Sequence, residues 1–130
     1  MTTLDPSTAT DSSPQAKQPI AKMLLVFIDE DDKFESMTLS EAIVRRLRKR
    51  DIAGATVLRG IMGYGAQHRI YGSGTLGIPE NRPVTILVVE TEERLNAVLP
   101  EISAMVKEGL VITIDAHIHK YTAGGPLRGE

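Results

Sequence analysis

The order in which strand-like and helix-like segments follow one another constrains the fold of this chain most. Apolar runs of strand length alternate with segments whose apolar residues recur at helical spacing. The six predicted elements are strand 21–28, helix 38 to about 50, strand 54–61, strand 82–90, helix 91 to about 108, and strand 110–121. This βαββαβ order predicts an α+β ferredoxin-like fold, in which four antiparallel strands carry both helices on one face.

Capping residues support the two helices. Thr38 with Glu41 three residues later has the spacing of a capping box, and Thr91 is the predicted cap of the second helix. Pro100 predicts a kink or a late start in that helix. Gly109 is predicted to end it.

The first and third predicted strands are apolar on both faces. In the first strand, Met23, Leu25 and Phe27 alternate with Leu24, Val26 and Ile28, and the third strand repeats the pattern. Two helices cover only one face of such a sheet, and soluble monomers rarely expose a large apolar patch. We therefore expect the protein to form a symmetric homo-oligomer.

Length and composition fit one globular domain of 130 residues. Residues 1–19 are expected to be a disordered arm, 20–121 the folded domain, and 122–130 a flexible tail. The formal net charge of −2 does not favour nucleic acid as a partner, and the chain has no cysteine. With no secretory signal and no apolar run long enough to span a bilayer, a cytoplasmic location is expected.

Residues 62–81 form the most informative segment, because five glycines and Pro79 argue against regular structure there. Loops near 20 residues are uncommon in small domains and are usually functional or disordered. Free backbone amides and basic side chains over residues 60–69 could form an anion-binding nest, whereas the plain alternative is a flexible hairpin. Neither a P-loop nor a dinucleotide fingerprint is present.

Several motifs together resemble one family. They are the run Gly-Ala-Thr-Val-Leu-Arg-Gly-Ile-Met-Gly-Tyr-Gly at 54–65, Glu41-Ala42-Ile43-Val44, the acidic turn after the first strand, and Met105-Val106-Lys107-Glu108-Gly109-Leu110. They are similar to the signature of domain-of-unknown-function family 190, which is placed with the nitrogen-regulatory P-II-like proteins. The resemblance implies a trimer of ferredoxin-like subunits. It also implies that a long loop (the T-loop) contacts partners and that small ligands, often adenine nucleotides, bind between subunits.

The resemblance also implies a set of ligand-binding residues. Gly54, Thr56 and Val57 match the Gly-x-Thr-Val of true P-II proteins, and the Gly-Tyr-Gly at 63–65 matches their Gly-Phe-Gly. The usual phosphate loop before the last strand is replaced by Lys-Glu-Gly-Leu at 107–110, so no triphosphate cradle is implied. The predicted ligand residues are Thr56, Arg59, Gly63, Tyr64, Gly65 and Arg69, and Arg59 could instead donate an intersubunit ion pair.

The predicted function is that of a regulatory protein and not of an enzyme. A small ligand, such as an adenine nucleotide, would bind between subunits and change how loop 62–81 engages a membrane transporter, channel or enzyme. No cofactor is required, and no serine has a convincing base for nucleophilic catalysis. Residues 29–32 are expected to be a solvated acidic turn.

The alternative prediction is a metal-binding trimer of the copper-tolerance type. Asp115, His117 and His119 are spaced two apart on a predicted strand and therefore share one face. The same three residues could equally line a polar part of an interface.

Overall fold

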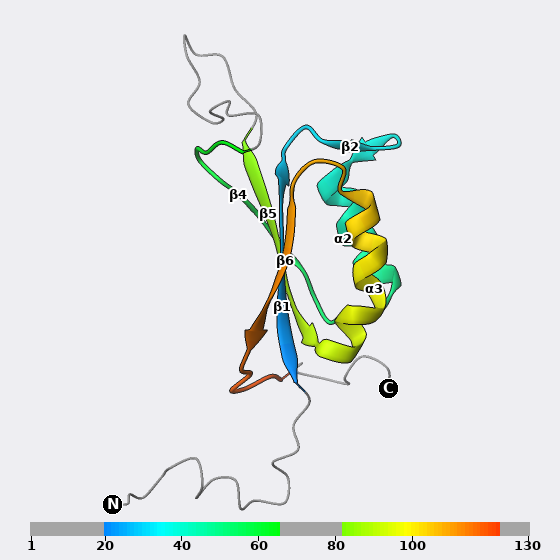
Figure 1. Cartoon of the computed structure of the whole chain (residues 1–130), viewed down its shortest axis with the longest axis vertical. Helices are drawn as coiled ribbons and strands as arrows, with labels where there is room; N and C mark the ends of the chain where they lie inside the picture. The colour runs from blue at the N-terminus through cyan, green and yellow to red at the C-terminus, as the bar shows by residue number, and fades with distance from the viewer. Residues whose placement is uncertain (1–19, 66–81, 123–130) are drawn as a thin grey trace, which may run out of the picture.

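The computed structural model describes residues 20–65 and 82–122. Its elements are strand β1 (Ala21–Asp29), strands β2 (Lys33–Phe34) and β3 (Met37–Thr38), helix α2 (Leu39–Lys49), strand β4 (Thr56–Arg59), strand β5 (Pro83–Thr91), helix α3 (Glu92–Met105) and strand β6 (Leu110–Ala116). The four long strands form one antiparallel sheet in the order β4-β5-β1-β6. Both helices lie on the same side of this sheet (Figure 1). The predicted ferredoxin-like fold is confirmed.

Two strands end earlier in the sequence than predicted. β4 pairs with β5 as far as Arg59, opposite Val84; the Gly60 N–H still donates to the Pro83 carbonyl, but Pro83 has no N–H with which to return a bond. β6 stops at Ala116 because that residue pairs with Ala21, the first residue of β1. The small hairpin of β2 and β3 was not predicted, since two-residue strands carry no periodic signal.

The helices begin where the caps predict. The Thr38 Oγ1 accepts a hydrogen bond from the Glu41 N–H at 3.3 Å, and the Thr91 Oγ1 accepts one from the Arg94 N–H at 3.3 Å. The late start proposed for the second helix is wrong, because α3 begins at Glu92 and runs through Pro100. Pro100 is exposed, so water can satisfy the carbonyl that loses its partner.

The core lies between the helices and one face of the sheet. Alternate residues of β1 and β5 are buried there, including Leu24, Val26 and Ile86, none of which retains measurable exposure. The apolar stripe of each helix packs against them, and its fully buried members are Ile43, Leu47, Leu95 and Ile102.

The opposite face of the sheet is also apolar, and no described element covers it. Leu25 of β1 lies between Leu87 of β5 and Ile112 of β6 on this face. Neighbouring side chains remain strongly exposed: Val89 at 38%, Ile114 at 48%, and Leu58 and Leu110 at 53% each. We call this surface the open face.

A cluster of one carboxylate and two guanidinium groups joins the helices. Arg46 on α2 and Arg50, the residue that follows its last turn, lie four positions apart and therefore reach the same side chain of α3. Arg50 donates two hydrogen bonds of 2.9 Å to the Glu101 carboxylate, and Arg46 donates a further one. These hydrogen bonds, Arg50 first, lower the pKa of Glu101 from 4.5 to about 2.

The lowered pKa predicts a defined pH dependence. Because folding lowers the pKa of Glu101, its ionised form stabilises the fold above about pH 4.5, and this contribution disappears as the pH falls toward 2. The midpoint of thermal unfolding of Glu101→Gln should therefore lie below that of the wild type at pH 7, and the difference should become smaller at pH 3 and vanish toward pH 2. Glu35→Gln, in the exposed turn between β2 and β3, is the control. An equal difference at pH 7 and pH 3 would contradict the prediction.

Gly109 occupies a position that no other residue fits. Its φ is +154°, and a Cβ placed there would lie 2.5 Å from the Phe27 carbonyl oxygen. The prediction that Gly109 ends the second helix is wrong, because α3 already ends at Met105; Gly109 instead directly precedes β6, which begins at Leu110.

We expect Gly109→Ala to reduce the free energy of unfolding by about 1–3 kcal/mol, since it combines a strained backbone with a clash against main-chain atoms. Gly54→Ala is the matched control because a Cβ there has nothing within 4 Å. Urea unfolding measures both variants, and equal stabilities would show the prediction to be wrong.

Candidate functional site

The long segment 62–81 leaves the sheet after β4 and returns at β5. Its first residues, 62–65, are described, whereas 66–81 lie outside the described residues. Two hydrogen bonds join the chain on either side of it: the Gly60 N–H donates to the Pro83 carbonyl at 2.7 Å, and the Arg82 Nη1 donates to the Ile61 carbonyl at 3.3 Å. We call residues 59–65 the outgoing root and residues 82–83 the return root.

The carboxylate of Glu30 connects the two roots. Its Oε1 accepts a hydrogen bond from the Arg82 N–H at 3.0 Å, and its Oε2 lies 3.2 Å from the Arg59 Nε. The Glu30 N–H in turn donates to the Arg82 carbonyl at 2.9 Å. One residue after β1 therefore contacts both the last residue of β4 and the residue before β5.

Two glycines allow the roots to approach each other closely. A Cβ on Gly60 would lie 2.8 Å from the Pro83 Cγ, and one on Gly63 would lie 3.2 Å from the same atom. The glycine spacing seen in the sequence thus has a packing reason at these two positions, which is independent of any ligand.

The structure places the predicted ligand residues in two groups. Arg59 and Gly63 belong to the outgoing root together with Tyr64 and Gly65, and the Tyr64 side chain is 67% exposed. Thr56 lies three residues before Arg59 on β4, so the two side chains leave the strand on opposite faces. Arg69 lies outside the described residues. Within one subunit, Thr56 and Arg59 do not converge.

Glu30 and Arg82 are the residues at this site that the sequence analysis did not single out. Glu30 was read only as part of the acidic turn, and Arg82 as the start of a strand. Arg59 was also predicted as a donor in an ion pair between subunits. In the structure its partner is a carboxylate of the same chain, that of Glu30. Their pairing joins residues 29 positions apart or more, which no local pattern reveals.

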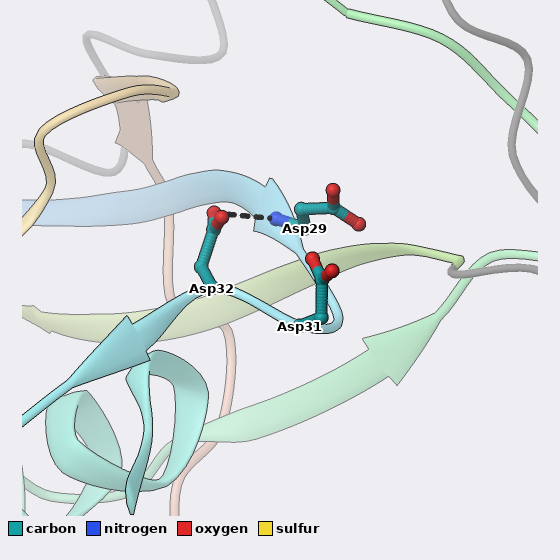
Figure 2. A group of neighbouring side chains, drawn as sticks. All are labelled: Asp29, Asp31 and Asp32. Atoms are coloured by element: carbon teal, nitrogen blue, oxygen red, sulfur yellow. Dashed lines mark hydrogen bonds between the residues drawn. The ribbon is translucent and has the colours of Figure 1, made fainter. Parts of the chain in front are cut away.

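The acidic turn lies beside this site at the end of β1 (Figure 2). The Asp32 Oδ2 accepts a hydrogen bond from the Asp29 N–H at 3.0 Å, and the Asp32 N–H donates to the Asp29 carbonyl at 3.1 Å. Burial, as the largest cause, raises the pKa of Asp32. The turn is confirmed, but Asp32 and Asp29 are half-buried and not fully solvated. The carboxylates of Asp29, Asp31 and Asp32 lie close together because all three residues belong to this turn.

The residues of the alternative metal site are not gathered in one subunit. Asp115 accepts a hydrogen bond of 2.7 Å from Lys22, which lowers the pKa of Asp115, and His117 and His119 follow the end of β6. Among the described residues, the only three metal-ligating side chains with atoms within 4.8 Å of one another are those of Asp29, Asp31 and Asp32.

A shallow hollow of about 410 Å³ lies between α2 and the edge strand β4. None of the predicted ligand residues lines it; its lining is Ser40, Glu41, Val44, Arg45, Arg48 and Val57. In the described part of the chain, no helix is both long and apolar enough to cross a membrane.

Comparison with known sequences identifies the family. Residues 21–118 match the DUF190 family, described as "Uncharacterized ACR". The chain belongs to this family. A UPF0166 protein of Methanocaldococcus jannaschii is 38% identical over 101 residues, which cover 77% of this chain and 93% of that protein. A UPF0166 protein of Aquifex aeolicus is 30% identical over 97 residues, or 75% of this chain and 91% of that protein. The resemblance seen in the sequence is confirmed.

Solved structures share the fold of this DUF190 protein at low sequence identity. The divalent ion tolerance protein CutA1 from Ehrlichia chaffeensis gives a TM-score of 0.53 at 18% identity, covering 79% of this chain and 87% of its own. CPII from Thiomonas intermedia K12, in a structure bound to ADP and bicarbonate, gives 0.51 at 20% identity, with coverage of 79% and 91%. In a second structure, CPII is described as a nitrogen regulatory PII-like protein. The fold is thus that of PII-like proteins.

Proposed function

We propose that this DUF190 protein is a PII-like regulatory protein that works as a homotrimer. An adenine nucleotide binds in the clefts between subunits, and the long segment 62–81 carries the signal to a partner protein. The partner is a membrane transporter, a channel or an enzyme, and the chain itself catalyses no reaction.

The observation that carries this proposal is the position of Arg59 at the outgoing root, in a fold that the ADP-bound CPII shares. Arg59 is 63% exposed at its side chain, so its guanidinium can reach a phosphate brought by a ligand. The neighbouring Tyr64 offers an exposed aromatic ring, and a Cβ placed on Gly65 would have nothing within 4 Å, so the backbone there is open. Charge, ring and backbone amides are the groups that recognise a nucleotide.

The open face supports assembly into a trimer. Its apolar side chains would be covered by other copies of the chain, which removes them from water. A site between subunits also accounts for Thr56, which faces away from Arg59 in its own subunit. In a ring of subunits, Thr56 of one copy and Arg59 of the next can face the same cleft.

The assembly is tested by a charge placed on the open face. Val89→Asp should dissociate the trimer, because an aspartate buried against apolar side chains is costly to desolvate. Val57→Asp is the matched control: Val57 is 43% exposed against 38% for Val89, but it lies on the other face of the sheet, at the edge. Light scattering after size exclusion should give three times the 14.2 kDa chain mass for the wild type and the control. A monomeric wild type would contradict the proposal.

Ligand binding is tested by thermal unfolding with ADP, AMP and bicarbonate. A ligand at roughly 100 times its dissociation constant stabilises the folded protein by about 2.7 kcal/mol, which is a clear shift of the melting temperature. The shift with ADP should be lost in Arg59→Ala and kept in Arg48→Ala, an exposed arginine on α2.

The same experiment separates the metal-binding alternative. A shift with Zn²⁺ or Cu²⁺ that is lost in His117→Ala, together with none for ADP, would favour a metal-binding trimer and contradict the nucleotide proposal. A shift with ADP that survives in Arg59→Ala would place the nucleotide elsewhere.

A further inference from the structure

The geometry points to Glu30 as an internal competitor for the ligand: its carboxylate occupies the anion-binding position of Arg59, and an anionic ligand takes that position by displacing it. This inference rests on the proposed function and adds how binding is communicated to the long segment. Glu30 is thus a latch between the two roots, closed when the site is empty and opened by the phosphate of the ligand.

The two oxygens of Glu30 have separate tasks. Oε2 contacts the Arg59 guanidinium at 3.2 Å, and Oε1 accepts the Arg82 N–H at 3.0 Å. A carboxylate is planar and rigid, so rotating Oε2 away from Arg59 also moves Oε1 relative to Arg82. Loss of the first contact therefore weakens the second, which lies on the return root.

The latch is weak enough for a ligand to open. Glu30 is 33% exposed and Arg59 63% exposed, so water screens their attraction. Ion pairs of this kind contribute little to stability, whereas a phosphate brings more charge and can bind the guanidinium through two oxygens. A buried ion pair at this position could not be exchanged so easily.

The negative charge of the acidic turn determines the direction in which removing the Glu30 carboxylate should change the affinity for an anion. Asp29, Asp31 and Asp32 lie in the same turn as Glu30, so Glu30 is one of four consecutive acidic residues at the end of β1. Removing the Glu30 charge should raise the affinity for an anion for two reasons. It frees the Arg59 guanidinium, and it reduces the local negative charge that repels the anion. Removing the Asp31 charge should lower the local negative charge while leaving the contact between Glu30 and Arg59 in place.

Isothermal titration of the full-length protein with ADP, pyrophosphate and adenosine tests the latch. Glu30→Gln should bind ADP and pyrophosphate about two- to fivefold more tightly than the wild type, the range that an exposed ion pair supplies. Its affinity for adenosine, which has no charge, should not change. The glutamine oxygen can still accept the Arg82 N–H, so the variant is expected to fold. Asp31→Asn, one residue along the turn, is the control and should change the pyrophosphate affinity less.

A double-mutant cycle isolates the pair. In an Arg59→Gln background, Glu30→Gln should no longer raise the affinity for pyrophosphate, because the competition requires both partners. ADP binding to the wild type with no gain in Glu30→Gln, or a gain that persists without Arg59, would overturn the latch and leave the proposed function standing. Absence of ADP binding in the wild type and in Glu30→Gln would overturn both.

Discussion

The packing of two helices against the central strands β1 and β5 is the interaction on which the rest of the structure depends. β1 lies between β5 and β6, and its inward side chains, such as Leu24 and Val26, have no measurable exposure. This apolar contact fixes the register of every strand, because a shift by one residue would turn the buried side chains to the other face. The ends of β1, β4 and β5 are thereby placed side by side, and the roots of the long segment lie at that end (Figure 1).

Polar contacts complete this arrangement where the apolar core ends. Glu30 joins the two roots, and the buried carboxylate of Glu90 accepts the N–H groups of Ala53 and Thr91 at the opposite end of β5. Both carboxylates bind backbone N–H groups that the sheet leaves unpaired. They differ in exposure: Glu90 is 4% exposed and fixed, whereas Glu30 remains accessible to water. That difference is why Glu30, and not Glu90, is suited to exchange partners with a ligand.

Much of the fold and part of the site could be predicted from local patterns. The apolar faces of β1 and β5 and the Thr38 and Thr91 caps each depend on residues close by in the sequence, so the sequence displays them directly. The ends of β4 and β6 could not be predicted, because they depend on where a partner strand stops, at Pro83 and at Ala21. Of the predicted ligand residues, Arg59, Gly63, Tyr64 and Gly65 lie together at the outgoing root, whereas Thr56 faces away from Arg59 within one subunit. Their role in binding a ligand stays a prediction.

The sequence by itself determined the order of elements, the strands that are apolar on both faces, and the DUF190 family motifs. All of these depend only on the spacing of residues along the chain. Only the tertiary structure decided that Arg59 meets Glu30, that Asp115 is paired with Lys22, and that Gly60 and Gly63 pack against Pro83. These contacts join segments distant in sequence. Their partners are chosen by how the strands are ordered and aligned in the sheet, which is a property of the whole core and not of any single motif.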